Sequence, residues 1–166
     1  FDEHEYQQLI AEYPETKTII RPFLGADELL YAIPRYCLWL DGVDTHKWAK
    51  LPPIKSRLQA VADARLLSKT QSVQDCAQYP GLFTQIRQPQ AQYIALPRHS
   101  SETRRYIPIV VLDRNVIAGD ALSILPSNDM FYLGLLQSLM HMIWIDNVCG
   151  RIKSDYRYSP AIWGNF

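Results

Sequence analysis

The sequence predicts an α+β fold, in which a small antiparallel sheet packs on a long buried helix and further short helices occupy the N-terminal half. Three observations lead to this prediction. The N-terminal half shows apolar residues at helical spacing between prolines. Residues 92–125 form short extended runs separated by turn residues. An apolar stretch then follows over residues 129–147, which is long enough for about five helical turns.

The N-terminal half is predicted to hold several short helices and one strand. Proline begins or ends most of these segments, because it fits the first turn of a helix and cannot continue one. Ile54, Leu58 and Val61 lie at helical spacing after Pro53. The predicted helices are Asp2–Glu12, Pro14–Ile20, Asp27–Leu30, Pro53–Ser68 and Val73–Gln78, and the predicted strand is Tyr36–Leu40, followed by a turn at Asp41-Gly42.

The antiparallel sheet is predicted over Tyr93–Leu125. The runs QYIALP, YIPIVVLD, NVIAG and LSIL follow one another with short connections. Connections this short cannot cross over between parallel strands, so neighbouring strands should be antiparallel. Tyr36–Leu40 is a candidate additional strand of this sheet.

The predicted core of the fold is a single helix over Asp129–Asn147. Ser127 or Asn128 should cap its N-terminus. Apolar side chains cover most of its circumference, and a helix that is apolar nearly all round is normally buried. We therefore expect this helix to be mostly inaccessible to solvent and to carry the sheet.

Composition favours one compact domain over residues 1–166, with 48% hydrophobic residues. The chain does not begin with Met, and we expect it to be a domain excised from a longer protein. Its 17 basic and 17 acidic residues cancel. A balanced charge counts against a generic nucleic-acid binder, although a local basic face within a larger enzyme remains compatible with it.

The three cysteines, Cys37, Cys76 and Cys149, are far apart and form no CxxC pair. This pattern argues against a disulfide framework or a zinc site and favours a reducing compartment. No signal peptide is apparent, and the most apolar stretch, Met130–Ile145, is too short and too polar in places for a membrane span. We expect a cytoplasmic domain that does not contact membranes.

Common catalytic motifs are absent from the sequence. There is no GxGxxG, Walker loop, HExxH or GxSxG. The four histidines are scattered, so we assign no catalytic residue and no metal site. A small hydrolase that uses His99 or His141 is a weaker alternative, because Ser100 and Ser101 beside His99 are neighbours in sequence only.

Residues 150–159, GRIKSDYRYS, place Arg151, Lys153, Asp155 and Arg157 at alternate positions. In an extended strand these four side chains would share one face. Lys can donate to guanine O6 and N7, and Asp can accept from cytosine N4, so the pattern suits base reading. The alternative is a solvated edge strand whose charges keep it soluble. We expect the intervening tyrosines to pack beneath this face rather than to stack on bases.

A second cluster mixes arginines with hydroxyl groups, a composition typical of phosphate contacts. The alternative is a surface loop whose charge Glu102 balances. The predicted phosphate contacts are Arg98, Ser100, Ser101, Arg104, Arg105 and, from the first cluster, Arg151.

Six runs of residues, in this order, resemble the target-recognition domain of MmeI-like restriction-modification enzymes. They are IIRPFLGADELL, RYCLWL, PGLFTQIRQP, YIALPRHSSETRRYIPI, LQSLMHMIW and GRIKSDYRYS, and they span the chain from about Ile19 onward. Members of this family join a nuclease, an adenine-N6 methyltransferase, a helical spacer and a DNA-reading domain in one chain. The resemblance implies that this chain binds double-stranded DNA and selects the site without catalysing a reaction itself.

The resemblance also implies where the chemistry lies. The parent would use S-adenosylmethionine for methylation and Mg for cleavage, and neither an NPPY-type motif nor a nuclease motif is present in these 166 residues. In the family, the positions that match Lys153 and Asp155 read the base pair just beyond the target adenine. Lys followed by Asp implies a site that ends in AG, and Arg157 would read a neighbouring base. A protein-interaction or scaffolding domain without base readout is the competing interpretation.

Overall fold

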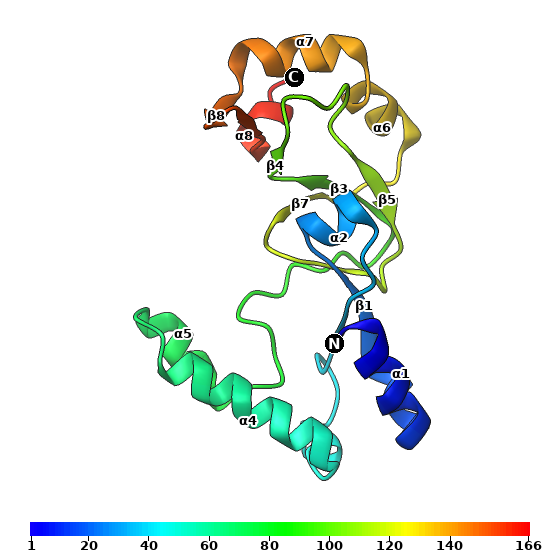
Figure 1. Cartoon of the computed structure of the whole chain (residues 1–166), viewed down its shortest axis with the longest axis vertical. Coiled ribbons are helices and arrows are strands. Elements are labelled where there is room, and N and C mark those ends of the chain that lie inside the picture. The colour runs from blue at the N-terminus through cyan, green and yellow to red at the C-terminus, as the bar shows by residue number, and fades with distance from the viewer. The chain divides into compact units, whose positions relative to one another are not determined.

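The computed structural model describes residues 1–166 and shows two compact units. The first unit consists of Phe1, Glu3–Arg21 and Cys37–Arg87, and the second consists of Asp2, Pro22–Tyr36 and Gln88–Phe166. The chain passes from one unit to the other at β1 (Ile20–Leu24) and at β2 (Tyr36–Leu38). Figure 1 labels many of the helices and strands of both units.

The first unit is helical. The predicted helices Asp2–Glu12 and Pro53–Ser68 are confirmed to within two residues at each end, whereas the predicted helix Val73–Gln78 covers parts of two elements, the α-helix Gln71–Asp75 and the 3-10 helix Cys76–Gln78. The predicted helix Pro14–Ile20 is a shorter 3-10 helix, because Ile20 already belongs to β1. The helices of the first unit are α1 (Glu3–Glu12), η1 (Pro14–Thr18), α3 (Thr45–Trp48), α4 (Pro52–Leu66), α5 (Gln71–Asp75) and the 3-10 helix η2 (Cys76–Gln78).

Two features fix α4 and the segment that follows it. Ile54 and Leu58, one turn apart, are its buried residues. At its C-terminal end the Arg65 guanidinium donates to three backbone carbonyls, those of Cys76 and Tyr79 at 2.9 Å and of Leu82 at 2.6 Å. Hydrogen bonds in which the donor is charged are among the stronger ones, so Arg65 holds the residues after α5 against the end of α4.

The second unit contains the remaining elements. They are α2 (Ala26–Tyr31), β3 (Tyr93–Pro97), β4 (His99–Ser100), β5 (Val110–Leu112), β6 (Ile117–Ala118), β7 (Leu122–Leu125), α6 (Met130–Leu136), α7 (Leu139–Val148), β8 (Gly150–Ile152), β9 (Asp155–Arg157) and α8 (Pro160–Trp163). The predicted one-turn helix over Asp27–Leu30 corresponds to α2. The mixture of helices with small sheets confirms the α+β class.

An antiparallel sheet with the order β5-β3-β7 forms the centre of this unit. Ala95 lies opposite Val110 on one side and Ile124 on the other. Every residue of β3 is buried, as expected for a central strand with elements on both faces. The antiparallel sheet predicted within Tyr93–Leu125 is therefore confirmed for these three strands.

Two further strands do not join this sheet, contrary to the prediction. β6 instead pairs in parallel with β1, with Phe23 opposite Ile117 and Leu24 opposite Ala118. The predicted additional strand at Tyr36–Leu40 is β2, which belongs to the small sheet β2-β1-β6. The prediction assumed pairing between neighbours in sequence, whereas β1 lies far earlier in the chain and a long connection allows parallel pairing.

The prediction of a single helix over Asp129–Asn147 is wrong, because the structure divides this stretch into two helices, α6 and α7. Asp129, rather than Ser127 or Asn128, caps α6 by accepting from the Phe131 N–H at 2.8 Å. Ser138 lies in an extended conformation and caps α7 by accepting from the His141 N–H at 3.1 Å. Gln137 donates to the Ile109 carbonyl at 2.8 Å. A side-chain cap within an apolar run ends one helix and begins the next.

The prediction that this helix is mostly inaccessible is also wrong. Met142 and Ile145 of α7 are 6% and 0% exposed, but Met140 and Ile143 are 69% and 55% exposed. Phe131 of α6 is exposed as well. Apolar character all round a helix shows only that several faces are able to be buried, and the sheet of this unit covers one of them.

Packing of this helical region on the sheet is nevertheless observed. The main core cluster joins residues of β3, the loop before β5, α6, α7, β9 and the segment just after β9. Its members are Ile94, Leu96, Ile107, Ile109, Leu136, Met142, Ile145, Tyr156 and Tyr158. The predicted packing of Tyr156 and Tyr158 beneath the charged segment is confirmed, because they are 4% and 0% exposed.

Candidate nucleic-acid interface

A three-stranded antiparallel sheet, β4-β9-β8, carries the charged residues predicted for the site. β8 and β9 form a hairpin over Gly150–Arg157, which we call the reading hairpin, and Ile152 lies opposite Asp155 in its last pair. On the other side of β9, His99 lies opposite Arg157. Figure 1 shows β4, β8 and α7 near the C-terminus of the chain.

The prediction of one extended segment with four charges on one face is wrong. The chain turns back at Lys153 and Ser154, and Lys153 has a φ of 58°, in the left-handed region. Residues directly opposite each other in antiparallel strands share a face. Arg151 lies opposite Tyr156 and therefore shares the inner face with this buried tyrosine, whereas Asp155 and Arg157 lie on the outer face.

The three predicted base-reading residues are exposed, and their side chains have no intramolecular partners. Lys153 at the turn and Asp155 and Arg157 on β9 are exposed. None of their side chains takes part in a hydrogen bond or an ion pair. The structure therefore lacks the Lys153–Asp155 ion pair that a purely solubilising role would favour, and these donors and acceptors are available to a partner.

Arg151 is occupied by neighbours on the inner face. Its Nη1 donates to the Ser154 carbonyl at 2.9 Å and to Glu102 Oε2 at 3.3 Å, and its Nη2 lies 3.5 Å from Asp146 Oδ1. The guanidinium lies 4.3 Å from the Tyr156 ring centroid. Arg151 therefore differs from the other predicted phosphate contacts, because two carboxylates already pair with this cation.

Tyr156 also contacts the carboxylate that pairs with Arg151. Its hydroxyl donates a short hydrogen bond to Asp146 Oδ1, the same oxygen that faces Arg151. This bond to a carboxylate is the largest cause that raises the pKa of Tyr156, because ionisation would place two negative charges together. The hydroxyl therefore stays protonated at neutral pH and acts as a donor.

Residues Arg98–Arg105, which we call the arginine loop, contain the other predicted contacts. Ser101 Oγ lies 3.0 Å from Thr103 Oγ1 and accepts from the Thr103 N–H at 3.3 Å, which shapes the turn. Ser100 is only 2% exposed and shares the inner face with Tyr156. Its side chain cannot reach a phosphate in this conformation, so the predicted contact of Ser100 is corrected to a core position.

The arginines of this loop have no carboxylate partner. Glu102 pairs with Arg151 rather than with a neighbour in the loop. Arg98 and Arg104 are half-buried, and Arg105 is exposed with its guanidinium 5.4 Å from the Tyr106 ring centroid. The alternative in which Glu102 balances the loop is therefore not what the structure shows for Arg98, Arg104 and Arg105.

The fold brings the two basic clusters together. β4 lies within the arginine loop and pairs with β9 of the reading hairpin, and the Arg98 carbonyl accepts from the Tyr158 N–H at 2.8 Å. His99 joins the outer face beside Arg157. Sequence reasoning missed this neighbour because no local spacing signals the pairing of β4 with β9, two segments far apart in the chain. It also missed Asp146, which is close to Arg151 in the sequence but lies in α7, on the other side of the bend that leads into β8.

The hydrolase alternative finds no support in the positions of its residues. His141 is fully buried, so a substrate cannot reach it. His99 is exposed on the outer face, but Ser100 beside it is buried on the inner face. No group of three or more His, Cys, Asp or Glu side chains is placed to hold a metal ion. No helix combines the length and apolar character that spanning a membrane requires.

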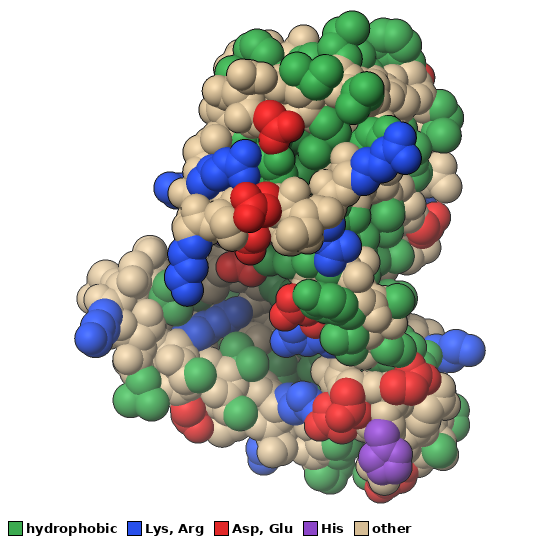
Figure 2. Space-filling view, turned by 45° about the horizontal axis from the view of Figure 1, so that its top comes forward, with side chains coloured by type: hydrophobic (Ala, Val, Ile, Leu, Met, Phe, Trp, Pro, Cys, Tyr) green, Lys and Arg blue, Asp and Glu red, His purple; other side chains and the backbone are tan.

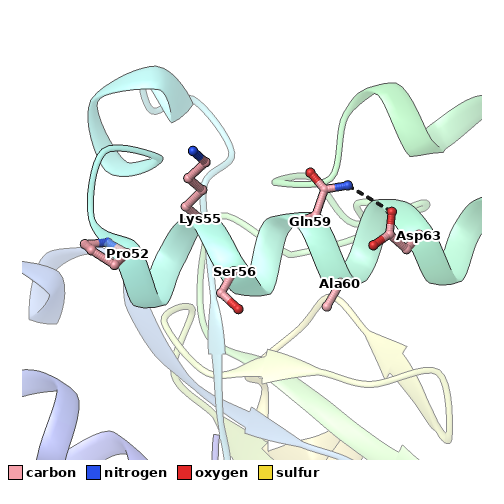
Figure 3. A pocket seen from close by; sticks show the side chains of 6 residues that line it. All are labelled: Pro52, Lys55, Ser56, Gln59, Ala60 and Asp63. Carbon is pink, nitrogen blue, oxygen red and sulfur yellow. Dashed lines mark hydrogen bonds between the residues drawn. The ribbon is translucent and has the colours of Figure 1, made fainter.

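A surface pocket lies in the first unit, along α4. Figure 3 shows its lining residues, all from this helix: Pro52, Lys55, Ser56, Gln59, Ala60 and Asp63. Gln59 donates to Asp63 at 2.9 Å across one turn. None of the predicted site residues lines this pocket, and its polar groups form an ordinary exposed helix face.

Charges of both signs are mixed on one face of the molecule. Figure 2 shows a face on which Lys and Arg side chains are interspersed with acidic and apolar ones. Such a surface does not bind anions through net charge. The outer face of the β4-β9-β8 sheet carries Asp155 and Arg157, two exposed charged groups without intramolecular partners. The fold and this site define a macromolecular recognition domain whose contacts depend on individual residues.

Comparison with known proteins identifies the family. A family model described as "MmeI, target recognition domain" matches residues 1–166. The chain belongs to this family of target-recognition domains, and the resemblance noted in the sequence is confirmed.

Two relatives agree with this assignment. DNA methyltransferase A of Bacillus subtilis (strain 168) is 32% identical over 161 residues, which cover 97% of this chain and 18% of the relative. A solved structure of the Type IIL restriction-modification enzyme MmeI in complex with DNA is 39% identical and superimposes with a TM-score of 0.93, covering 99% of this chain and 22% of that one. The chain thus spans about a fifth of the length of these relatives.

Proposed function

We propose that this chain is the sequence-specific DNA-binding domain of a bifunctional restriction-modification enzyme, in which it positions duplex DNA for methylation of adenine N6 and for cleavage. The exposed and unpaired Lys153, Asp155 and Arg157 carry this proposal, since a base-reading residue must have its hydrogen-bonding groups free. Family membership and the DNA complex of a relative at a TM-score of 0.93 support it. A scaffolding domain would not need this arrangement of unpaired donors and acceptors.

The chemistry of the parent enzyme lies outside these residues. The relatives are described as a DNA methyltransferase and a restriction-modification enzyme. We place an adenine-N6 methyltransferase that uses S-adenosylmethionine, and a nuclease that uses Mg, elsewhere in the same cytoplasmic bacterial polypeptide. Residues 1–166 act as one recognition domain without a catalytic residue, and their partners are double-stranded DNA and the methyltransferase domain.

Base reading is assigned to the reading hairpin. Lys153 donates to O6 and N7 of a guanine, and Asp155 accepts from N4 of the cytosine in the same pair. Lys153 lies in the two-residue turn and Asp155 directly follows it, so both lie at the tip of the hairpin, the part that can enter the major groove. Arg157, on the outer face of β9 beside His99, reads a neighbouring base.

Phosphate contacts are assigned to the arginine loop. Arg98, Arg104 and Arg105 have no carboxylate partner, and Ser101 adds a hydroxyl group at the turn. Arginine forks match phosphate geometry, and such contacts set register on the duplex without reading its sequence. The pairing of β4 with β9 fixes this loop relative to the hairpin, so both can engage one stretch of duplex.

The overall function is tested by the methylated motif in DNA from cells that express the full-length parent. We expect N6-methyladenine at a single motif in which the adenine is followed by guanine. Single-molecule sequencing of genomic DNA measures this directly. Methylation without a sequence preference, or of a motif in which another base follows the adenine, would show that the assigned contacts are wrong.

The phosphate contacts are tested separately by Arg104→Ala and Arg105→Ala in the full-length enzyme. Each should weaken binding to all duplex sequences and reduce the salt slope of the logarithm of the binding constant by about one. Titration of cognate and unrelated duplexes at several salt concentrations measures both quantities. Lys69→Ala, which removes an exposed cation between α4 and α5, is the control and should retain the slope. A changed sequence preference with unchanged overall affinity would contradict the assignment.

A further inference from the structure

Arg151 holds the tip of the reading hairpin from its inner face. We infer that Arg151 is a positioning residue for base recognition, which acts through the Ser154 backbone rather than by touching DNA. This inference rests on the proposed function, because it concerns how Lys153 and Asp155 are presented. It replaces the phosphate contact that the sequence predicts for Arg151.

Four contacts fix the guanidinium, and they come from three parts of the second unit. Ser154 belongs to the hairpin turn, Glu102 to the arginine loop and Asp146 to α7. The Tyr156 ring supplies the fourth contact at 4.3 Å. Because the same cation joins all of these, the orientation of the hairpin is coupled to α7 and to the arginine loop.

The bond to Ser154 acts on the turn itself. The Ser154 carbonyl belongs to the peptide group that joins Ser154 to Asp155, so a donor at 2.9 Å restricts the rotation of that peptide. The residue before it is Lys153, with a φ of 58°. This region is disfavoured for a residue with a Cβ atom, and Gly or Asn is usual at such a turn position. A strained conformation persists only when its surroundings determine it.

Arginine is suited to this role and lysine is not. Its planar fork presents five N–H donors, so it bonds a carbonyl and two carboxylates at once while its face lies on an aromatic ring. Lysine carries three donors on a single nitrogen and cannot repeat this geometry. Glu102 and Asp146 are themselves about half exposed, at 47% and 54%. The pairs therefore add little stability, and geometry is the main effect.

Loss of the Arg151 contacts should change the discrimination between base pairs rather than the overall affinity for DNA. The phosphate contacts proposed for the arginine loop do not pass through Arg151, so binding to DNA in general is retained. Lys153 and Asp155 would still be present on a more mobile turn, and their two contacts to one base pair would no longer be held together. A site whose supporting contacts are lost no longer holds its recognition groups in the productive geometry.

The test is Arg151→Lys in the full-length parent enzyme, which keeps the positive charge and removes the planar guanidinium with its several N–H donors. Duplexes that differ only in the base pair after the adenine give the ratio of methylation rates for AG and AC sites. We expect this ratio to fall about tenfold, within the range of a single base-pair mismatch, with an unchanged salt slope of binding. A ratio at the wild-type value overturns the inference, whatever the slope does.

Two further variants make the result specific. Arg114→Lys, in the exposed loop between β5 and β6, is the matched control and should keep the wild-type ratio. If Arg151→Lys does not give folded enzyme, Tyr156→Phe is used instead, because it keeps the ring and removes only the hydrogen bond to Asp146. A smaller fall in the ratio supports the inference, and an unchanged ratio overturns it.

The failure of this inference is distinguishable from failure of the proposed function. The double variant Lys153→Glu with Asp155→Arg tests base reading directly. If that exchange changes the preferred base pair while Arg151→Lys leaves the ratio intact, only the positioning role is wrong. If neither variant changes the ratio, the assignment of the hairpin to base reading is wrong as well.

Discussion

Exchanging Lys153 for Glu together with Asp155 for Arg is expected to move methylation by the full-length enzyme from sites that end in AG to sites that end in AC. The reason is a reversal of donor and acceptor. Glu accepts from the cytosine N4 amino group, and Arg donates to guanine O6 and N7. The exchanged residues therefore match the reversed base pair in the same positions.

The size of the change in preference follows from the cost of the mismatch between the wild-type residues and the reversed base pair. Against a reversed pair, the wild-type Lys153 would face an amino donor and Asp155 would face carbonyl and ring-nitrogen acceptors. A mismatch of this kind costs about 1–3 kcal/mol, which corresponds to as much as about a hundredfold in affinity. Methylation rates on paired duplexes that end in AG and AC measure the preference before and after the exchange.

The structure indicates that the double variant should fold. Both residues are exposed, and neither side chain has an intramolecular partner to lose. The matched control is Lys55→Glu with Asp63→Arg on α4, which makes the same two charge changes in the other unit. The control should keep its preference for AG. An active hairpin variant that still modifies only AG sites would falsify the assignment of Lys153 and Asp155.

Features that depend on local chemistry could be predicted from the sequence. Helix α4 follows Pro52 and Pro53 and carries Ile54 and Leu58 at helical spacing. The central strand β3 is a short apolar run between turn residues, and all of it is buried. In both cases the information lies within one turn or one strand of the residue concerned.

The reading hairpin shows why a local pattern can mislead. Alternate charges from Arg151 to Arg157 are compatible with one extended strand, and the sequence Lys153-Ser154 lacks the Gly or Asn that normally marks a tight turn. The turn is held instead by contacts from outside the hairpin, chiefly Arg151 with Asp146 and Glu102. Those partners are close in space only after the unit has folded.

The division of the long helix has a similar cause. Nothing within residues 129–147 resembles a helix breaker such as proline, and Gly134 lies inside α6 rather than at the break. The break depends on Ser138, whose hydroxyl caps α7, and on Gln137, whose amide reaches the Ile109 carbonyl. Polar residues in an apolar run were therefore informative about helix ends, although periodicity alone could not show which role they take.

His141 links α7 to the chain that follows the reading hairpin. Its Nε2 and the Tyr158 hydroxyl lie 2.7 Å apart and share a hydrogen bond. The imidazole is fully buried, and the Phe166 ring lies against it with centroids 4.6 Å apart. Burial lowers the pKa of His141 from 6.5 to about 4, because the charged form loses its hydration. The same burial raises the pKa of Tyr158.

The folded chain should therefore lose stability in mild acid through His141. Between pH 6.5 and about 4 the unfolded state binds a proton at this residue and the folded state does not, so the free energy of unfolding falls as the pH falls. At about 1.4 kcal/mol per pH unit, the full interval corresponds to about 3 kcal/mol. Urea titrations of residues 1–166 between pH 7 and 4 measure this loss.

His141→Gln, which retains a hydrogen-bonding side chain without an imidazole, should reduce the pH dependence of the unfolding free energy by one proton, whereas the exposed His99→Gln should retain it. If His141→Gln kept the wild-type dependence, another group would be responsible, and the buried pair beneath the reading hairpin would not be the acid-sensitive part of this unit.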